Sequence, residues 1–199
     1  MTEIAPYAIG VTGGIGSGKS VVSQLLRLMD VPVYDCDSEA KRLMHQSAEI
    51  RAALIQAVGE SVYRTDGQLD KVLLAAYMFG NAAHVAQINR IVHPVVRADF
   101  RRWARESGRA VVAVESAILF KAGMDADVDS VWVVYAPMDI RLQRAVQRDG
   151  SDEEAIRKRM KSQFSDAEFL QRADRVVYND GARSLILQVK ENLALLGVL

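Results

Sequence analysis

A glycine-rich stretch near the amino terminus has the residue types and the spacing of a phosphate-binding loop. It fills every position of the pattern Gly-x4-Gly-Lys-[Ser/Thr] with Gly13, Gly14, Ile15, Gly16, Ser17, Gly18, Lys19 and Ser20. Glycines let the backbone adopt positive φ and bring its N–H groups close to phosphate oxygens. Lys19 can reach the β and γ oxygens of a nucleotide, and the Ser20 hydroxyl can ligate Mg²⁺. The pattern predicts a nucleoside triphosphate site, and a glycine-rich turn with a chance Lys-Ser is the alternative.

Two carboxylates follow a short apolar run. Asp35 and Asp37 come after residues 31–34, Val-Pro-Val-Tyr, which we predict to form a strand. Both carboxylates then lie at the carboxyl end of a strand, where open α/β sheets generally bind ligands. Asp37 is alternatively the N-cap of a helix that starts at Ser38, and Asp35 is alternatively a turn-forming residue.

A basic segment lies in the carboxyl-terminal half of the chain. Arg141, Arg144 and Arg148 have the i, i+3, i+7 spacing of one helix face, for which a solvated charged face is the usual explanation. Residues 141–161 hold seven Lys or Arg against four Asp or Glu, in a chain whose net charge is zero. A mobile basic flap is what a phosphoryl transfer enzyme uses to neutralise the migrating group and exclude water. The charge excess favours that functional interpretation.

The segments around these residues have the pattern of a layered α/β domain. Residues 7–11 form an apolar run before the loop, and apolar residues recur after it with helical spacing. A strand, a loop and a helix in this order are the context that a phosphate loop requires. Five apolar runs are predicted strands, at residues 7–11, 31–34, 110–114, 130–135 and 175–178. Strands that alternate with helices predict parallel pairing.

Between the second and third predicted strands the pattern is helical only. Helices are predicted at residues 38–58, 70–79 and 82–106, and two more, at 139–148 and 182–196, follow later strands. An ordinary crossover needs only a dozen or so residues, so about seventy residues indicate an inserted subdomain. Pro94 is predicted to break the hydrogen-bond ladder of its helix. Spacing alone makes the neighbouring His93 a structural residue more often than a functional one.

The composition of the chain limits its domain content, its partners and its compartment. The chain has 199 residues, of which 50% are hydrophobic, so it can bury the core of one domain with an inserted subdomain. Lys plus Arg equals Asp plus Glu at 25 each, so we expect neither nucleic acid nor an anionic membrane as a partner. Cys36, the single cysteine, excludes an internal disulfide and fits a reducing compartment. Residues 1–6 lack signal-peptide features and no apolar run is long enough to span a bilayer, so we expect a cytoplasmic protein.

Seven short segments, in order along nearly the whole chain, match the pattern of one family. They are residues 10–20, 31–37, 89 with 91–94, 147–149, 159 with 163, 173–174 and 179–181. The loop alone is generic, whereas Thr-Gly-Gly-Ile-Gly-Ser-Gly-Lys-Ser followed by Asp-x-Asp and His-Pro is specific. With these segments the chain resembles the dephospho-CoA kinase family.

Two positions depart from the family pattern. The Arg that is often found four residues after the second Asp is Lys41 here, with Arg42 next to it. A Pro-Leu-Leu-x-Glu segment is common after the third strand, whereas this chain reads Ala117-Ile118-Leu119-Phe120-Lys121. The first departure puts one substrate-contacting cation in question, and the second removes a proline and a carboxylate whose roles are not carried over.

The resemblance implies an enzyme that transfers the ATP γ-phosphoryl group to the ribose 3′-hydroxyl of dephospho-CoA, the last step of coenzyme A biosynthesis. It implies a three-layer α/β P-loop kinase fold with a five-stranded parallel sheet, a helical inserted substrate domain and a small helical lid. The expected boundaries are residues 1–36, 107–148 and 167–199 for the core, 37–106 for the acceptor domain and 149–166 for the lid. ATP, Mg²⁺ and dephospho-CoA are the expected ligands, and no obligatory protein partner is inferred.

The resemblance also assigns roles to individual residues. The expected ATP-binding residues are Gly14, Ile15, Gly16, Ser17, Gly18, Lys19, Ser20, Val21 and Asn179. Lys19, Asp37, Arg148 and Arg159 are the expected catalytic residues, with Asp37 as the base and the arginines as lid cations. Asp37, Lys41 and His93 are expected to bind the acceptor, and Ser20 and Asp35 to bind the metal.

Two other functions use a phosphate loop of this kind. A kinase for a nucleoside monophosphate or a shikimate-like alcohol would share the core and differ in the inserted domain. A GTPase switch or a mechanical ATPase is less favoured, because the chain has no Asn-Lys-x-Asp guanine motif. The strand at 110–114 is also followed by Glu115 and not by a Walker-B Asp.

Overall fold

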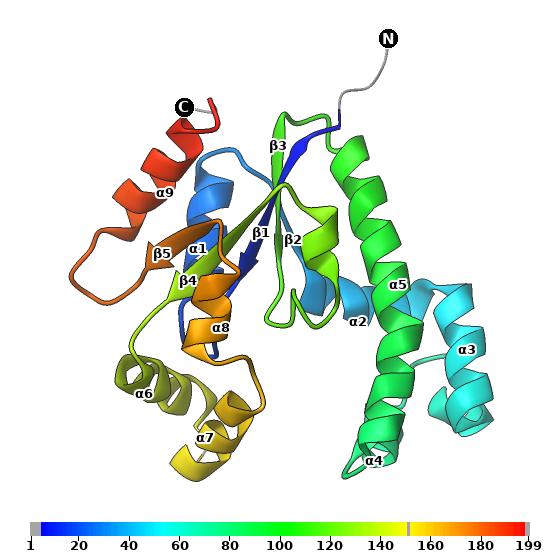
Figure 1. The fold of residues 1–199 in the computed structure, drawn as a ribbon. Coiled ribbons are helices and arrows are strands. Elements are labelled where there is room, and N and C mark those ends of the chain that lie inside the picture. The colour runs from blue at the N-terminus through cyan, green and yellow to red at the C-terminus, as the bar shows by residue number, and fades with distance from the viewer. Residues whose placement is uncertain (1–4, 151, 198–199) are drawn as a thin grey trace. The chain divides into compact units, whose positions relative to one another are not determined.

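The computed structural model describes residues 5–150 and 152–197 (Figure 1). The chain divides into two compact units. One comprises the described residues up to Tyr34 and from Trp103 onward, and the other is Asp35–Arg102. The sequence-based boundaries of core, acceptor domain and lid stay a prediction. Residues 1–4, 151 and 198–199, which those boundaries include, lie outside the described residues.

A five-stranded parallel sheet has the strand order β2-β3-β1-β4-β5. Its strands are β1 (Tyr7–Thr12), β2 (Val33–Asp35), β3 (Val111–Glu115), β4 (Ser130–Tyr135) and β5 (Arg175–Tyr178). All five predicted strands are therefore confirmed, with ends that differ by at most two residues. The near-continuous apolar runs of β1, β3 and β4 form the three central strands. Such runs suit central strands because helices cover both faces of a parallel sheet.

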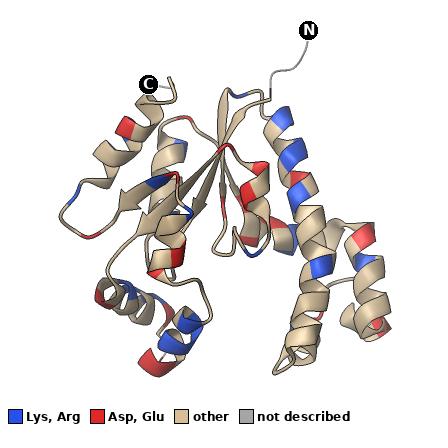
Figure 2. Cartoon of the chain, in the orientation of Figure 1, with Lys and Arg blue, Asp and Glu red and all other residues tan. Residues whose placement is uncertain are grey.

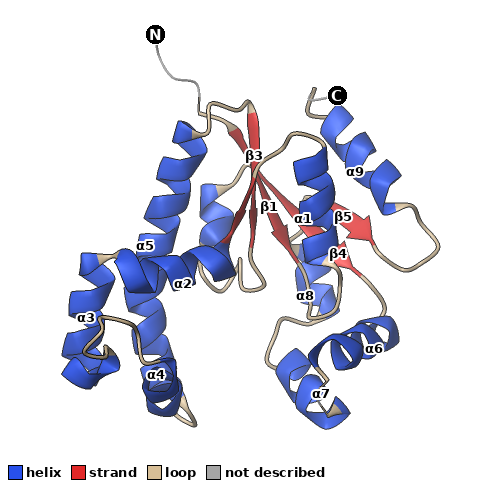
Figure 3. Ribbon diagram, turned by 180° about the vertical axis from the view of Figure 1, so that it is seen from behind, coloured by secondary structure: helices blue, strands red, loops and turns tan. Residues whose placement is uncertain are grey.

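The main core lies on one face of this sheet, beneath α1 (Lys19–Leu28) and α9 (Leu185–Ala194), which pack side by side (Figure 3). It joins fully buried side chains of β1, such as Ile9 and Val11, to Trp132 of β4 and to apolar residues of both helices. On the opposite face, α8 (Asp166–Gln171) packs against β4 (Figure 1). The arrangement is the three-layer architecture that the sequence predicts.

Glycine at position 10 lets the segment after β3 approach β1 closely. A Cβ at Gly10 would lie 2.8 Å from Cδ1 of Leu119 and 3.1 Å from Cγ2 of Val128. Leu119 is fully buried there. The segment from β3 to the 3₁₀ helix η2 (Met124–Asp127) therefore packs directly on the backbone of the strand that precedes the phosphate loop.

The second unit is helical. It contains α2 (Cys36–Gln46), α3 (Ala48–Val58), the 3₁₀ helix η1 (Glu60–Val62), α4 (Lys71–Met78) and most of α5 (Ala82–Glu106). The single helix predicted over residues 38–58 is wrong, because Ser47 ends α2 and caps α3 by accepting a hydrogen bond from the N–H of Ile50. Serine is a favoured N-cap, so this break is encoded locally.

Helix α5 continues through Pro94, where we expected the ladder to break. Proline lacks an N–H and removes one hydrogen bond, yet the 25-residue helix stays continuous. Its buried residues Ile88, Val92, Val96 and Phe100 recur every four positions and form one apolar stripe. Burial of that stripe on both sides of the proline holds the helix together.

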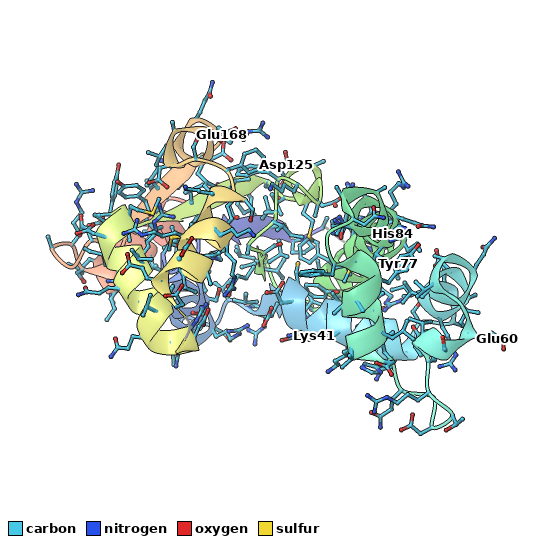
Figure 4. All side chains as sticks on the ribbon, turned by 90° about the horizontal axis from the view of Figure 1, so that it is seen from below. Lys41, Glu60, Tyr77, His84, Asp125 and Glu168 are labelled. Atoms are coloured by element: carbon cyan, nitrogen blue, oxygen red, sulfur yellow. The ribbon has the colours of Figure 1, made fainter. Side chains whose placement is uncertain are left out.

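The corner between α4 and α5 is closed by stacked rings. Tyr77 and His84 lie 3.9 Å apart between ring centroids, with nearly parallel planes, and both are labelled in Figure 4. The carbonyl oxygen of Tyr77 lies 2.7 Å from Nδ1 of His84, and the Tyr77 hydroxyl donates to Gln87. This histidine thus has a local structural role.

The remaining helices follow β4 and β5. They are α6 (Met138–Asp149), α7 (Glu153–Lys161), α8 and α9. The last helix begins at Leu185 and not at residue 182, because Ser184 caps it and Asp180 binds the N–H groups of Ala182 and Arg183 in a preceding turn. Among the helices that the structure describes, none has the length and apolar character needed to cross a membrane.

Candidate active site

The phosphate-binding pattern forms the turn between β1 and α1. Gly13, Gly16 and Gly18 have φ values of 149°, 77° and 96°, in the region that favours glycine. Gly18 also caps α1, and a Cβ on it would collide with the side-chain amide of Asn179. Glycine is therefore required at position 18 by the backbone conformation and by a neighbour from another part of the chain.

Lys19 is the first residue of α1 and reaches back over the loop. Its Nζ donates to the carbonyl oxygens of Gly13, at 3.0 Å, and Gly14, at 3.2 Å. Ser20 follows it and is exposed. The first N–H groups of a helix have no carbonyl partner in a preceding turn and carry partial positive charge. Together with the Lys19 ammonium they make this turn a site for an anion such as a phosphate.

Asn179, in the connection after β5, contacts the loop directly. Its Nδ2 donates to the carbonyl oxygen of Ser17 at 2.8 Å, and its own carbonyl oxygen accepts from Nη1 of Arg144 at 3.1 Å. Its backbone N–H donates to Tyr135 at the end of β4. The structure thus brings Asn179 and Arg144 to the base of the predicted ATP site, and the ATP-binding role of Asn179 stays a prediction.

Both predicted lid cations bind one carboxylate. Arg148 donates from Nε to Oδ1 of Asp149 at 2.7 Å, and Arg159 donates from Nη1 to Oδ2 at 2.8 Å. The hydrogen bond from Arg148, followed by that from Arg159, lowers the pKa of Asp149, and Asp149 in turn raises the pKa of Arg148. Asp149 therefore stays ionised down to acidic pH. The charges of both signs on α6 and α7 are visible in Figure 2.

The explanation of Arg141 as part of a solvated face is wrong. Arg141 is only 4% exposed, and its Nη2 donates to Oδ1 of Asp166 at 2.7 Å. Its guanidinium lies against Gly14, where a Cβ would collide with Nη1. The i, i+3, i+7 spacing includes Arg141, but spacing cannot tell which member of a face points inward. The spacing therefore places Arg141 in the basic segment without indicating a separate role for it.

Gln163 is a second residue whose contact with the loop is not predicted by any sequence pattern. Its Oε1 accepts a hydrogen bond from the backbone N–H of Ile15 at 2.8 Å. The matching pair Arg159 and Gln163 marked the segment as part of the family pattern. No local pattern indicates which main-chain donor a glutamine 148 positions away will bind.

A cavity of about 230 Å³ opens beside Ile15. One wall is residues 117–121 after β3, and the other is formed by Arg159 and residues 162–164 with Phe169. Lys121, which stands where the family pattern has a carboxylate, donates to the carbonyl oxygen of Ser162 at 2.6 Å. The departure at Lys121 thus joins the two walls of this cavity.

In the second unit, Asp35 and not Asp37 caps helix α2. Oδ1 of Asp35 accepts from the backbone N–H groups of Asp37, at 3.0 Å, and Ser38, at 3.4 Å. Its Oδ2 accepts from the Ser38 hydroxyl at 2.9 Å. The alternative of Asp37 as N-cap is therefore wrong, and Asp35 does more than form a turn. Asp37 lies exposed in the first turn of α2.

The other two predicted acceptor residues also lie on helices of this unit. Lys41 is exposed on α2 (Figure 4), whereas Arg42 is held by Glu39 and Asp99 at 2.5 and 2.6 Å. The neighbouring arginine is thus engaged in ion pairs, and Lys41 is the more accessible cation. His93 on α5 is partly buried, and desolvation by burial lowers its pKa, so it is a neutral imidazole at pH 7.

The fold is shared with solved structures over nearly the whole chain. The protein TT1252 from Thermus thermophilus has a TM-score of 0.84 at 29% identity, over 96% of this chain and 98% of that chain. The dephospho-CoA kinase from Campylobacter jejuni shares the fold with a TM-score of 0.69 at 22% identity, over 95% and 96%. The parallel sheet with a phosphate loop between β1 and α1 defines a P-loop nucleotide-binding fold.

The family follows from sequence. The family model described as dephospho-CoA kinase matches residues 7–184. The chain belongs to the dephospho-CoA kinase family, the ATP-using kinases that phosphorylate dephospho-CoA in coenzyme A biosynthesis. The dephospho-CoA kinase of Bacteroides fragilis strain YCH46 is 46% identical over 189 residues, which are 94% of this chain and 92% of that protein.

Proposed function

We propose that this chain transfers the γ-phosphoryl group of ATP to the ribose 3′-hydroxyl of dephospho-CoA, giving coenzyme A and ADP. The observation that carries the ATP half is the geometry of the loop, where Lys19 spans two loop carbonyls at the start of α1. Membership of the dephospho-CoA kinase family supplies the acceptor half.

On the ATP side, residues 14–21 surround the phosphates and hold them with backbone N–H groups other than that of Ile15, which donates to Gln163. The Lys19 ammonium exchanges its loop carbonyls for the β and γ oxygens. Its charge stabilises these oxygens more as negative charge moves onto the leaving group, so Lys19 lowers the barrier and does not only bind ATP. Asn179 supports the loop from the side where we place the adenine.

Mg²⁺ fits the oxygen ligands at the loop. The exposed Ser20 hydroxyl is a hard ligand, and Glu115 at the end of β3 is a carboxylate, fixed by a 2.6 Å hydrogen bond from the Ser23 hydroxyl. Glu115 thus joins Ser20 in our proposed ligand set, directly or through water. The Asp35 oxygens already cap α2, which makes Asp35 a weaker candidate. A bound Mg²⁺ would neutralise charge on the β and γ phosphates.

On the acceptor side, we assign the base to Asp37, two residues after Asp35, which caps α2. A carboxylate there accepts the proton of the ribose 3′-hydroxyl as the oxygen attacks phosphorus. Lys41 and His93 bind the acceptor, His93 as a neutral group. Arg148 and Arg159 leave Asp149 for the transferring phosphoryl group and balance its charge.

A coupled reaction tests this proposal. The purified protein is mixed with Mg-ATP and dephospho-CoA, and the products are identified by mass spectrometry and by ADP release. We expect coenzyme A and ADP to form in equal amounts. AMP and shikimate serve as competing acceptors, so phosphorylation of either in preference to dephospho-CoA would favour another small-molecule kinase. ADP release that ignores every acceptor would favour an ATPase.

A further inference from the structure

One residue of the phosphate loop, Ile15, is held from two sides by the segment that follows β4. Its backbone N–H donates to Oε1 of Gln163. Its side chain packs against an apolar cluster of α6 and α7. The buried members of that cluster are Leu142, Ala145, Ile156 and Met160. The loop and the predicted lid segment, residues 149–166, therefore meet at Ile15.

A second contact between the phosphate loop and the lid segment involves Asp166, three residues after Gln163. Asp166 accepts a hydrogen bond from Nη2 of Arg141, whose Nη1 lies against Gly14. The main chain of Arg141 also lies against Gly16, where a Cβ would collide with the Arg141 carbonyl oxygen. Residues on both sides of Ile15 are thus packed against a buried arginine that is paired with the end of the lid segment.

The loop needs such support because its glycines give it conformational freedom. Three of its glycines have positive φ, and a glycine loses more backbone entropy on ordering than any other residue. A hydrogen bond that fixes the loop before ATP arrives reduces the ordering that binding must supply, which raises affinity. ATP that binds the ordered loop must by linkage favour the lid position in which Gln163 contacts it.

We propose that Gln163 is a positioning residue that holds the phosphate loop in its ATP-receiving shape and links ATP affinity to the position of the lid. The proposal rests on the proposed function only in taking the loop as the ATP site. Gln163 acts through the Ile15 N–H and does not itself touch the reacting atoms.

Two matched variants test it. Gln163→Met keeps the length of the side chain and removes the acceptor, and Gln143→Met makes the same change at an exposed position of α6. We expect Gln163→Met to raise the Kd for Mg-ATP about three- to tenfold by calorimetry, the usual worth of one neutral hydrogen bond. The KM for dephospho-CoA at saturating ATP should stay unchanged. ATP-dependent protection of residues 153–161 against proteolysis should weaken. Gln143→Met should match the wild type in all three measurements.

Three results would overturn the proposal. Wild-type affinity in Gln163→Met would show that the contact does not order the loop. Tighter binding would show that Gln163 competes with the phosphates. A raised KM for dephospho-CoA at unchanged ATP affinity would place Gln163 at the acceptor. If Gln163→Met lowers Tm, Gln163→Asn, one methylene too short to reach Ile15, replaces it in the same comparison.

The proposed function is tested separately in the same preparation. Coenzyme A formation by the wild type is measured beside the calorimetry. An affinity difference between the variants without coenzyme A formation would contradict the assigned acceptor and leave the role of Gln163 standing. Coenzyme A formation together with equal ATP affinities of the variants would support the assigned acceptor and contradict the role of Gln163.

Discussion

The ammonium of Lys19 lies 3.0 Å from the carbonyl oxygen of Gly13, within its own phosphate loop. A carbonyl oxygen carries partial negative charge, so it holds the cation at the place where we expect phosphate oxygens to arrive. The full charge of a phosphate attracts the ammonium more strongly than a carbonyl does. Exchange of one for the other is therefore favourable when ATP binds.

Lys19→Ala should lower kcat more than tenfold while the fold survives. The reason is that the fixed charge stabilises the leaving oxygens more in the transition state than in the bound ground state. Steady-state kinetics and circular dichroism measure the two properties. A variant that keeps more than a tenth of wild-type kcat would have lost less than about 1.4 kcal/mol of transition-state stabilisation. That result would contradict a catalytic role for Lys19.

Asp37→Asn should lower kcat by roughly two to four orders of magnitude, the usual worth of a general base. Tm and ATP affinity should stay near the wild-type values, because Asp35 and not Asp37 caps α2. Asp35→Ala is the matched control. It removes the cap, so it should lower the free energy of unfolding by about 1 kcal/mol. Near-normal turnover of Asp37→Asn would exclude Asp37 as the base.

Asp149→Asn should loosen the lid segment in the absence of ligands. The change removes the carboxylate that holds Arg148 and Arg159, which then repel each other. Limited proteolysis should cut residues 152–166 faster than in the wild type, and Mg-ATP with dephospho-CoA should restore protection because phosphates replace the carboxylate. Equal cleavage of both proteins without ligands would contradict a holding role for Asp149.

Asp166→Asn should destabilise the protein, because it leaves the buried Arg141 without its charged partner. Breaking a buried ion pair is strongly destabilising, but the side chain of Asp166 is 36% exposed and water screens the pair in part. We therefore expect a loss of about 1–3 kcal/mol in the free energy of unfolding, measured with urea. Asp152→Asn, which changes the exposed N-cap of α7, should cost clearly less.

His93 should make stability depend on pH in the acidic range. Burial lowers its pKa below the ordinary value of 6.5, so the unfolded chain binds a proton more readily than the folded one. The free energy of unfolding should fall as the pH drops through 6.5, until the pH lies below the lowered pKa. His93→Gln should flatten this part of the curve, and parallel curves for variant and wild type would contradict the assignment.

Local patterns were enough to predict the strands, since an apolar run such as residues 130–135 has the same meaning wherever it stands. They also placed the loop, because its glycines are needed for its own backbone. The break at Ser47 was missed although its cap is local, because helical periodicity continues on both sides of it. Arg141 and Gln163 could not be placed, because their partners Asp166 and Ile15 become neighbours only when the sheet and helices have packed.

The packing of Leu119 on Gly10 has a consequence for the cavity beside Ile15. Leu119 is one of the residues that line this cavity. It can lie this close to β1 because Gly10 has no side chain at the point of contact. Any larger residue at position 10 would crowd Leu119 and so disturb the wall of the cavity formed by residues 117–121. The absence of a side chain at Gly10, in the core, thus contributes to the volume that is open to a ligand.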